Sequence, residues 1–325
     1  MVIRWGIVGC GNISEQFATC LEPLEKAELV AVASQTPGKA EQFASKFGNP
    51  KAYTSYQDLV RDTQVDVVYI GTTHNFHHEH TMLALNNEKH VLCEKPVSLN
   101  ARLAQEMFDL AANKNLFLME AVWTRFHPAT LKMVELVKAG TIGEVFTVQA
   151  DFSIIRAFDP NHRLYNPELG GGALLDLGIY PLTFAHLVYE EFPKSFKTSA
   201  VLGKSGVDET SAYLLEYEGG KTAVLSSSCR SSSPHLGLVI GSKGYMSVPD
   251  FFHPQELFIR SPDSDEQHLK LPYDLLGYGP EAKEVMRCLE AGLLESPLMP
   301  RATSIEMMKL MDSFRAEWGM KYPHE

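Results

Sequence analysis

The sequence predicts an α/β protein of two domains: a doubly wound parallel sheet in residues 1–122, then an α+β domain with a mostly antiparallel open sheet in residues 123–325. A chain of 325 residues is too long for one ordinary hydrophobic core and suits two. The first third alternates short apolar strands with helical patterns, which is typical of a parallel sheet covered on both faces. From about residue 144 onward, β-like runs separated by turns predominate.

The predicted elements of the first domain alternate along the chain, except that two helices follow the second strand. The strands are Ile3–Val8, Leu29–Ala33, Val65–Ile70, His90–Cys93 and Leu116–Met119, and the helices are Ile13–Leu21, Gly38–Phe47, Gln57–Asp62, His78–Asn86 and Ala101–Asn113. In the second domain the predicted strands are Val145–Ile155, Ala212–Tyr217, Ala223–Ser228, Leu236–Ile240, Tyr245–Val248 and Leu257–Arg260, and the helices are Ala173–Tyr189, Pro280–Glu290 and Ser304–Trp318.

The composition excludes several classes of protein. A formal charge of −11 argues against nucleic acid or an anionic membrane as the main partner. Five scattered cysteines without C-x-x-C spacing favour a reducing cytosol over a disulfide framework. The first strand begins too early for a signal peptide, and the apolar stretch Ala173–Tyr189 contains Asp176, Pro181 and His186, so it is expected to be a buried helix. We therefore expect a cytoplasmic protein.

A glycine-rich turn, Gly9-Cys10-Gly11-Asn12-Ile13-Ser14, follows the first strand and opens the first helix. Gly9 suits a tight turn and Gly11 suits the close approach of a pyrophosphate, to which the start of the helix offers free N–H groups. The third glycine of the usual fingerprint is replaced by Ser14, a residue small enough for close packing of helix and strand. This pattern predicts a Rossmann-type dinucleotide site.

The end of the second strand indicates which dinucleotide binds. Enzymes that use NAD usually carry an acid there for the ribose 2′-hydroxyl, and this chain has none. Hydrogen-bond donors that suit a 2′-phosphate are present instead: Ser34, Gln35, Thr36 and Lys39. The arginine often used for that phosphate is missing. NADP is therefore favoured, with NAD as the alternative.

Two polar loops leave neighbouring strands at the same edge of the predicted sheet. Thr72-Thr73-His74-Asn75-Phe76-His77 follows one strand, and Glu94-Lys95-Pro96 follows the next. Ligands of open α/β sheets bind at the carboxyl ends of the strands. A lysine at that edge can donate a proton or a hydrogen bond to a reacting oxygen.

With these motifs the chain resembles the glucose-fructose oxidoreductase, inositol dehydrogenase and rhizopine-catabolism family. The resemblance rests on Gly9–Ile13, Thr73–His77, His90–Pro96 and Gly170–Tyr180, and it covers nearly the whole chain in order. Within the family, Met119-Glu120-Ala121-Val122-Trp123-Thr124-Arg125-Phe126 is similar to the dimeric dihydrodiol dehydrogenase and NADP-dependent xylose dehydrogenase branch.

The resemblance implies that Lys95 is catalytic and that Asp176 and Tyr180 join it from the second domain. The two latter residues stand four apart on a predicted helix and so share one face. Many family members carry histidine where this chain has Tyr180. A phenol titrates near pH 10, so Tyr180 needs an ammonium such as that of Lys95 to act as a base. The expected reaction is proton removal by Tyr180 with hydride transfer to the nicotinamide, while Asp176 orients the substrate.

Further residues are candidates for binding. Thr72, Thr73, Asn75, His77 and Glu94 are expected on the cofactor side, with Trp123 and Arg125 at the domain junction. The substrate-wall candidates are Phe152, Arg156, Asp159, Asn161 and Arg163. His74, His77, His78 and His80 invite a metal site, but hydride transfer to nicotinamide needs no metal, and we expect none.

The sequence thus predicts an NAD(P)-dependent dehydrogenase, acting on CH–OH or CH–CH donors, whose substrate is a sugar or a cyclic trans-diol. An NAD-dependent polyol or inositol-type dehydrogenase is the alternative enzyme. A nucleotide-binding sensor without chemistry is the alternative outside enzymes, although it has no need of Lys95, Asp176 and Tyr180 together. The family resemblance suggests a homodimer or higher oligomer formed through the antiparallel sheet.

Overall fold

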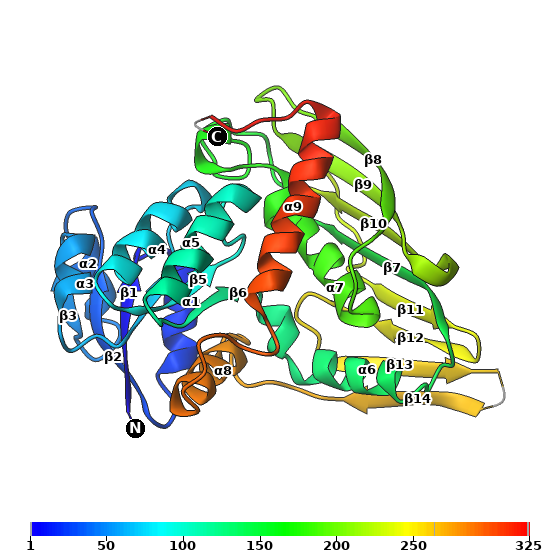
Figure 1. Cartoon of the computed structure of the whole chain (residues 1–325), viewed down its shortest axis with the longest axis horizontal. Coiled ribbons are helices and arrows are strands. Elements are labelled where there is room, and N and C mark those ends of the chain that lie inside the picture. The colour runs from blue at the N-terminus through cyan, green and yellow to red at the C-terminus, as the bar shows by residue number, and fades with distance from the viewer. Residues whose placement is uncertain (1, 263, 324) are drawn as a thin grey trace. The chain divides into compact units, whose positions relative to one another are not determined.

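A computed structural model describes residues 2–262, 264–323 and 325. Its contacts divide the chain into two compact units (Figure 1). The first contains the residues up to Trp123 together with Asp274–Met308, and the second contains Thr124–Tyr273 with Lys309–Glu325. The first stretch of the first unit ends at Trp123, one residue after the domain boundary that the sequence predicts at residue 122. Residues 274–308 group with the first unit instead of the second, because the helix Gly279–Glu290 (α8) packs against the first helix of the chain.

The first unit has a six-stranded sheet in which every pairing is parallel, in the order β3-β2-β1-β4-β5-β6. This order confirms the predicted doubly wound fold. The strands are β1 (Ile3–Val8), β2 (Ala27–Ala33), β3 (Lys51–Tyr53), β4 (Val67–Ile70), β5 (His90–Glu94) and β6 (Leu118–Ala121).

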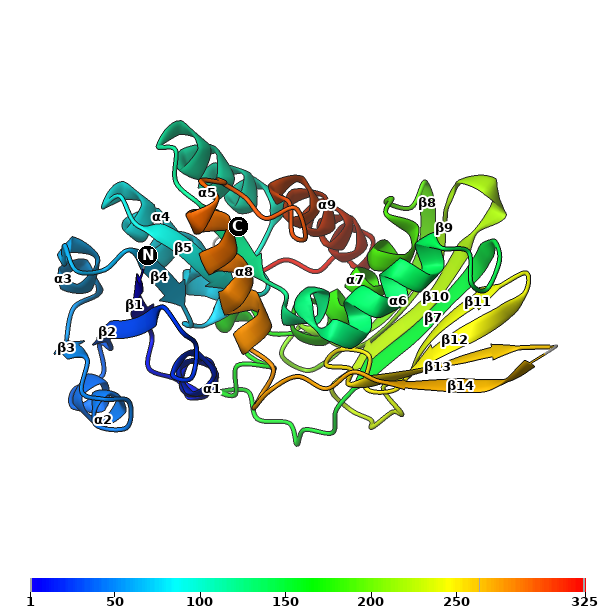
Figure 2. The same cartoon turned by 90° about the horizontal axis from the view of Figure 1, so that it is seen from below.

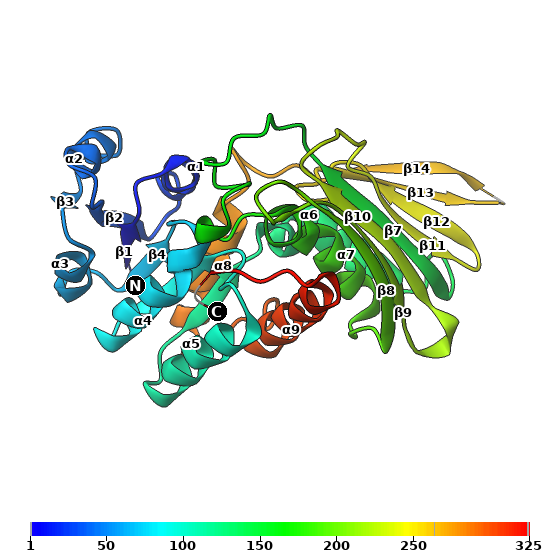
Figure 3. The same ribbon diagram turned by 90° about the horizontal axis from the view of Figure 1, so that it is seen from above.

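Helices cover both faces of this sheet. Figure 2 and Figure 3 show α1 (Asn12–Leu21) and α2 (Lys39–Ala44) on one face, with α4 (His77–Asn86) and α5 (Ala101–Asn113) on the other. A short helix, α3 (Tyr56–Arg61), follows β3. Since β1, β4 and β5 lie between two layers of helices, they are almost wholly buried, which explains their continuous apolar sequences.

The second unit has an eight-stranded sheet in the order β14-β13-β12-β11-β7-β10-β9-β8. One pair, β7 with β10, is parallel and the other pairings are antiparallel, so the prediction of a mostly antiparallel sheet is confirmed. The strands are β7 (Val145–Ser153), β8 (Ser195–Leu202), β9 (Asp208–Glu216), β10 (Thr222–Ser228), β11 (Gly237–Gly241), β12 (Gly244–Val248), β13 (Glu256–Ser261) and β14 (Ser264–Lys270).

Helices of this unit pack on one face of the sheet. The helix α7 (Ile179–Tyr189) contacts β7, β10 and β11, and α6 (Pro128–Lys138) contacts β13. The long helix α9 (Arg301–Trp318) places Phe314 against Tyr213 of β9. Within the described residues, one helical stretch, Pro167–Tyr189, is long and apolar enough to cross a membrane, but 94% of its most apolar window is buried. As predicted, it is a core helix.

The predicted helix over Ala173–Tyr189 is continuous but contains a π-helical turn near its start. Residues Leu174–Gly178 form a π-helical turn and α7 begins at Ile179, so that Pro181 lies in the first turn of α7. A proline has no backbone N–H, so Pro181 cannot donate a hydrogen bond to the preceding turn, which is the π-helical one. Turns of π-helix occur frequently at functional sites.

Candidate active site

The glycine loop after β1 has the space that a dinucleotide requires. Gly9 has φ +94°, and a Cβ there would lie 2.8 Å from the Thr72 side chain. Gly11 precedes α1 and makes no side-chain cap, while a Cβ at Gly11 would meet only the Gly71 carbonyl, at 4.0 Å. The N–H groups of the first turn, from Asn12 and Ile13 onward, are therefore not capped by the Gly11 position. This loop fits a pyrophosphate.

Ser14 replaces the third glycine of the fingerprint without preventing close packing. Its side chain is fully buried and its hydroxyl donates to the Gly9 carbonyl at 2.5 Å. A Cβ at Gly71 would lie 2.2 Å from that hydroxyl oxygen. The glycine that permits contact between α1 and the sheet is thus Gly71, on the loop after β4.

The loop after β2 contains no acid and lies beside the glycine loop. Ser34 Oγ accepts the N–H of Thr36 at 3.2 Å, and Gln35, Thr36 and Lys39 are exposed. Burial raises the pKa of the Cys10 thiol to about 11, and the nearby Lys39 ammonium opposes that rise. Cys10 itself stands between Gly9 and Gly11.

Tyr56 belongs to the same edge of the sheet, although the sequence patterns did not single it out. Burial raises the pKa of its phenol, and a hydrogen bond to the backbone of Gln35 opposes that effect. Its ring packs edge-on against His80 with centroids 4.6 Å apart. Tyr56 is the first residue of α3 and closely follows the three-residue strand β3, which was too short to be recognised in the sequence, so no pattern placed Tyr56 at the sheet edge.

His77 connects the loops after β4 and β5. Its ring is fully buried, with Nδ1 2.7 Å from the Pro96 carbonyl oxygen and Nε2 3.1 Å from that of Thr72. In the same loop the Thr73 hydroxyl donates to Asn75 Oδ1 at 2.7 Å. The ring nitrogens of His77 therefore already have partners within the protein.

Lys95 stands at the carboxyl end of β5, where it was predicted, and is half-buried. The preceding Glu94 is 6% exposed and directs its carboxylate into the unit. Glu94 Oε1 accepts the hydroxyl of Tyr69 at 2.6 Å, and Oε2 accepts the Lys95 N–H at 3.2 Å. Through these two hydrogen bonds, Glu94 links the backbone of Lys95 to Tyr69 on β4, and so it fixes the start of the lysine loop, residues 94–96.

The four clustered histidines, His74, His77, His78 and His80, differ in their surroundings. His80 Nδ1 lies 3.1 Å from Thr72 Oγ1, and burial lowers the pKa of His80 to about 4. His78 pairs with Glu106 at 3.0 Å, and His74 packs edge-on against His77. Within the part of the chain that the structure describes, no three His, Cys, Asp or Glu side chains are arranged to hold a metal ion.

In the second unit, Asp176 and Tyr180 are buried on consecutive turns of one helical segment. Asp176 is 4% exposed, and its Oδ1 lies 3.0 Å from Nη1 of Arg163. The Tyr180 ring packs edge-on against Phe152 and Phe252, with centroids 5.3 and 5.9 Å away. Of the predicted residues, Tyr180 is therefore brought against Phe152, and Asp176 lies one turn earlier on the same helical segment.

The structure also orders the predicted substrate-wall residues. Arg163 forms an ion pair with Asp176, and Arg156, Asp159 and Asn161 lie exposed on the loop before it. Phe252 and His235 are additions to this wall. Phe252 stacks on Phe152 at 4.1 Å, and His235 Nε2 lies 2.7 Å from the Ser153 carbonyl oxygen. Both come from distant loops, so no local pattern could have marked them.

Trp123 and Arg125 fall on either side of the boundary between the units. Trp123 stacks on Tyr278 of the first unit, with centroids 4.5 Å apart. Arg125 is 7% exposed in the second unit, and its charge adds to burial in lowering the pKa of His186 to about 4. Their predicted role beside the cofactor stays a prediction.

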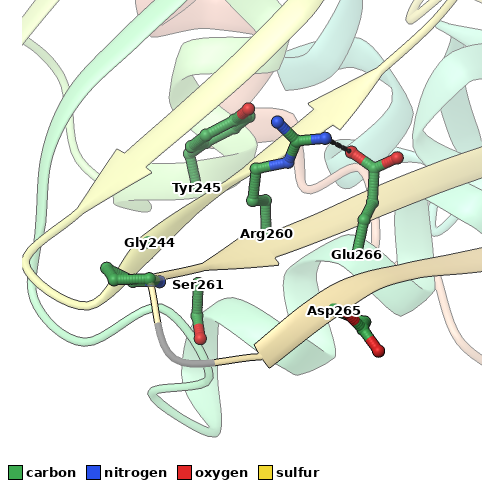
Figure 4. Close-up of a pocket in the computed structure, with 7 residues that line it drawn as sticks. Gly244, Tyr245, Arg260, Ser261, Asp265 and Glu266 are labelled. Carbon is green, nitrogen blue, oxygen red and sulfur yellow. Dashed lines mark ion pairs between the residues drawn. The ribbon is translucent and has the colours of Figure 1, made fainter.

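A hollow of about 480 Å³ lies at the far end of the large sheet, over β12, β13 and β14. Its lining contains none of the predicted site residues. Figure 4 shows that Arg260 and Glu266 face each other across it, 3.1 Å apart. The lining residues are Gly244, Tyr245, Arg260, Ser261, Pro262, Asp265 and Glu266.

Known proteins resemble the chain over its full length. Trans-1,2-dihydrobenzene-1,2-diol dehydrogenase of Danio rerio is 38% identical over 334 residues, covering 100% of this chain and 99% of that protein. The protein of the same name from Mus musculus is 36% identical, with the same coverage. Among solved structures, KijD10, a 3-ketoreductase from Actinomadura kijaniata in complex with NADP and TDP-benzene, has a TM-score of 0.86 and 26% identity, covering 97% of this chain and 98% of that one.

Residues 3–122 match the family model described as an oxidoreductase family with an NAD-binding Rossmann fold. Residues 130–247 match the GFO/IDH/MocA C-terminal domain. Fold and sequence together define an NAD(P)-dependent oxidoreductase with a Rossmann domain. More narrowly, the chain belongs to the GFO/IDH/MocA family, as its motifs predicted.

Proposed function

We propose that this protein is an NADP-dependent dehydrogenase that oxidises a hydroxyl-bearing carbon of a cyclic trans-diol or a sugar. The observation that carries the proposal is the position of Lys95, half-buried at the carboxyl end of β5 on a loop fastened by Glu94 and His77. A cation held at that edge suits a reacting oxygen. The full-length similarity to trans-dihydrodiol dehydrogenases supports the substrate class.

NADP is the proposed cofactor because the loop after β2 offers Ser34, Gln35, Thr36 and Lys39 and no carboxylate. An anionic 2′-phosphate would be repelled by an acid at this position and attracted by the Lys39 ammonium. KijD10, at 26% identity, was crystallised with NADP, which supports the same choice. The remaining binding residues are proposed to be Gly9, Gly11, Asn12, Ile13, Thr72, Thr73, Asn75, Trp123 and Arg125.

In the proposed reaction the bound nicotinamide accepts a hydride from the carbon that bears the hydroxyl. The Tyr180 phenol removes the hydroxyl proton, and the Lys95 ammonium favours the ionised phenol and stabilises the oxygen as it becomes a carbonyl. Asp176, held by Arg163, orients the substrate. Phe152 and Phe252 offer an apolar surface to the ring of a diol or a sugar. In the reverse direction the same groups return the proton.

A homodimer in the cytosol is proposed for the assembled enzyme. The face of the large sheet opposite α7 presents apolar side chains. Leu214 on β9 and Val224 on β10 are directly paired and are 36% and 49% exposed. Apolar neighbours on an open sheet favour burial against a second copy. Light scattering after size-exclusion chromatography should give a mass near twice 36.2 kDa; a mass of one chain would contradict the dimer.

The test of function is the absorbance of reduced nicotinamide with NADP or NAD and a panel of trans-diols, pentoses, hexoses and inositols. Reduction of NADP by a trans-diol or a sugar is the expected result. Turnover with NAD alone and a polyol would favour the alternative enzyme and overturn the interpretation of the Ser34–Lys39 loop. Tight nucleotide binding without turnover of any substrate would favour the sensor.

A further inference from the structure

A buried acid lies under the start of the helical segment that contains Asp176. Asp208, the first residue of β9, is fully buried. Its Oδ2 accepts two hydrogen bonds, from the Leu174 N–H at 2.7 Å and from the Ser211 hydroxyl at 2.8 Å. Leu174 is the first residue of the π-helical turn Leu174–Gly178, so the carboxylate binds an N–H that has no acceptor within the turn.

The other carboxylate oxygen makes this arrangement unusual. Oδ1 of Asp208 is buried and has no hydrogen-bond partner among the described residues. It faces Gly172, where an added Cβ would lie 2.3 Å away and where φ is +118°. The preceding residue, Gly171, is also held in place, because the Gly171 carbonyl accepts the Tyr322 hydroxyl at 2.6 Å. The start of the segment is therefore fixed from two sides, by Asp208 and by Tyr322.

Burying this carboxylate is unfavourable for folding. Burial raises the pKa of Asp208 to about 6, although the bonds from Ser211 and Leu174 and the charge of Arg315 oppose the rise. The Arg315 guanidinium forms ion pairs with two other carboxylates, those of Asp312 at 2.7 Å and Glu325 at 2.6 Å. The other titratable groups facing Asp208 are Tyr213, Tyr322 and Cys229. The Asp208 carboxylate is buried and ionised at neutral pH, with hydrogen bonds to only one of its two oxygens. Such a group suggests a role other than stability.

We propose that Asp208 is a positioning residue, whose ionised carboxylate holds residues 172–178 in the conformation that presents Asp176 and Tyr180 to the substrate. The inference rests on the proposed catalytic role of those two residues. An ionised acceptor binds the Leu174 N–H more strongly than a neutral one. Protonating Asp208 weakens that bond and loosens the segment. Turnover should therefore fall as the pH drops through about 6.

The substitution Asp208→Asn distinguishes a positioning role of Asp208 from a purely structural one, because the two roles predict different changes in stability and turnover. The amide keeps the shape and an acceptor for Leu174 and Ser211, but it carries no charge. Removing an incompletely paired buried charge should leave the melting temperature at pH 7.5 unchanged or higher. Turnover should nevertheless fall by about three- to tenfold, and by more in Asp208→Ala, which has no acceptor. A residue that serves only stability would not raise stability and lower turnover in the same variant.

Two readouts test the proposal. The pH profile of kcat should show an acid limb near pH 6 in the wild type that is absent in Asp208→Asn. Hydrogen exchange of the peptide covering residues 170–180 should be faster in both variants at pH 7.5, with NADP affinity unchanged. The adjacent acid provides the control. Glu209 is 8% exposed and pairs with Arg230 at 3.5 Å, so Glu209→Gln should leave both readouts as in the wild type.

Unchanged exchange in Asp208→Asn, or the same acid limb as in the wild type, would overturn the positioning role. The exchange measurement needs no substrate, so it decides the matter even if the wild type turns over nothing in the panel. In that case faster exchange would support Asp208 as the residue that orders the segment, while the missing turnover would count against the proposed substrate class alone.

Discussion

Nδ1 of His77 lies 2.7 Å from the carbonyl oxygen of Pro96, the residue after Lys95. His77 comes from the start of α4 and Pro96 from the loop after β5, so one buried ring fastens two loops at the carboxyl edge of the sheet. Because Nε2 faces the Thr72 carbonyl at 3.1 Å, the ring also holds the loop after β4. The position of the lysine loop thus depends on a residue outside it.

His77→Ala should destabilise the first unit and reduce turnover. The substitution leaves a cavity and an unpaired buried carbonyl, which together cost about 2–4 kcal/mol. Unfolding in urea measures that loss, and kcat should fall because the lysine loop is less fixed. The control is His78→Ala, since His78 is partly exposed and pairs with Glu106 at 3.0 Å. Equal effects of the two substitutions would contradict the fastening role.

Ser34→Asp should change the cofactor preference. The aspartate can still accept the Thr36 N–H that Ser34 accepts at 3.2 Å, but it adds a negative charge where we expect the 2′-phosphate. Repulsion of a partly desolvated phosphate by about 1–2 kcal/mol weakens NADP binding by roughly five- to thirtyfold, and NAD should bind no worse. Fluorescence titration of the reduced cofactors measures both affinities.

The control for this substitution places the same charge outside the site. Ser45 is exposed at the end of α2, with its hydroxyl on the Gln42 carbonyl at 2.8 Å. Ser45→Asp should leave the preference for NADP intact. If Ser34→Asp also leaves it intact, the 2′-phosphate does not lie at the Ser34–Lys39 loop.

Local patterns were sufficient to locate the parts of the site whose chemistry and conformation reside in one stretch of chain. The glycine turn at Gly9 and Gly11 and the lysine after β5 are of this kind. No sequence pattern indicated Asp208, Phe252 or Tyr56, because their partners are far away along the chain. Leu174 and Asp208, for example, are 34 positions apart. A single sequence shows that Asp208 is an acid but not which N–H it accepts.

The elements that the sequence did not reveal have a physical explanation as well. The strand β8 alternates exposed and half-buried residues because it is an edge strand, and its sequence lacks a continuous apolar face. The strand β3 has three residues, and α6 begins two residues after the helical turn Trp123–Phe126, where the sequence predicts the domain junction. The sequence of Ala173–Tyr189 predicts a helix, but the acceptor of the Leu174 N–H, Asp208, lies 34 positions further along the chain, so the segment alone did not reveal the π-helical turn.

Glu281→Gln should make the stability of the protein less dependent on pH. Glu281 on α8 is fully buried, and neither of its carboxyl oxygens has a hydrogen-bond partner among the described residues. Burial, together with the charge of Glu94, raises its pKa well above the ordinary value. Since the folded state retains this proton longer than the unfolded chain, the free energy of unfolding should fall as the pH rises above about 4.5, by about 1.4 kcal/mol for each unit until the folded-state pKa is reached.

In Glu281→Gln that decline should be smaller, and the variant should be more stable than the wild type at pH 9. Urea unfolding at pH 5, 7 and 9 measures the difference. Glu290 stands on the same helix but is exposed and pairs with Lys26 at 3.0 Å, so Glu290→Gln serves as the control and should follow the wild-type curve. Parallel curves for wild type and Glu281→Gln would show that Glu281 is ionised in the folded protein.

Lys95→Ala should abolish turnover while cofactor binding persists. The proposed reaction needs the ammonium to favour the ionised Tyr180 and to stabilise the reacting oxygen, so its removal should lower kcat by about 10²–10⁴-fold. The glycine loop and the Ser34–Lys39 loop are untouched, so the Kd for NADP should stay within about threefold of the wild type, a change of under 1 kcal/mol. Lys283→Ala, on the exposed face of α8, should behave as the wild type in both measurements. Loss of turnover together with loss of NADP binding would make Lys95 a cofactor ligand only, and normal turnover would remove it from the catalytic site.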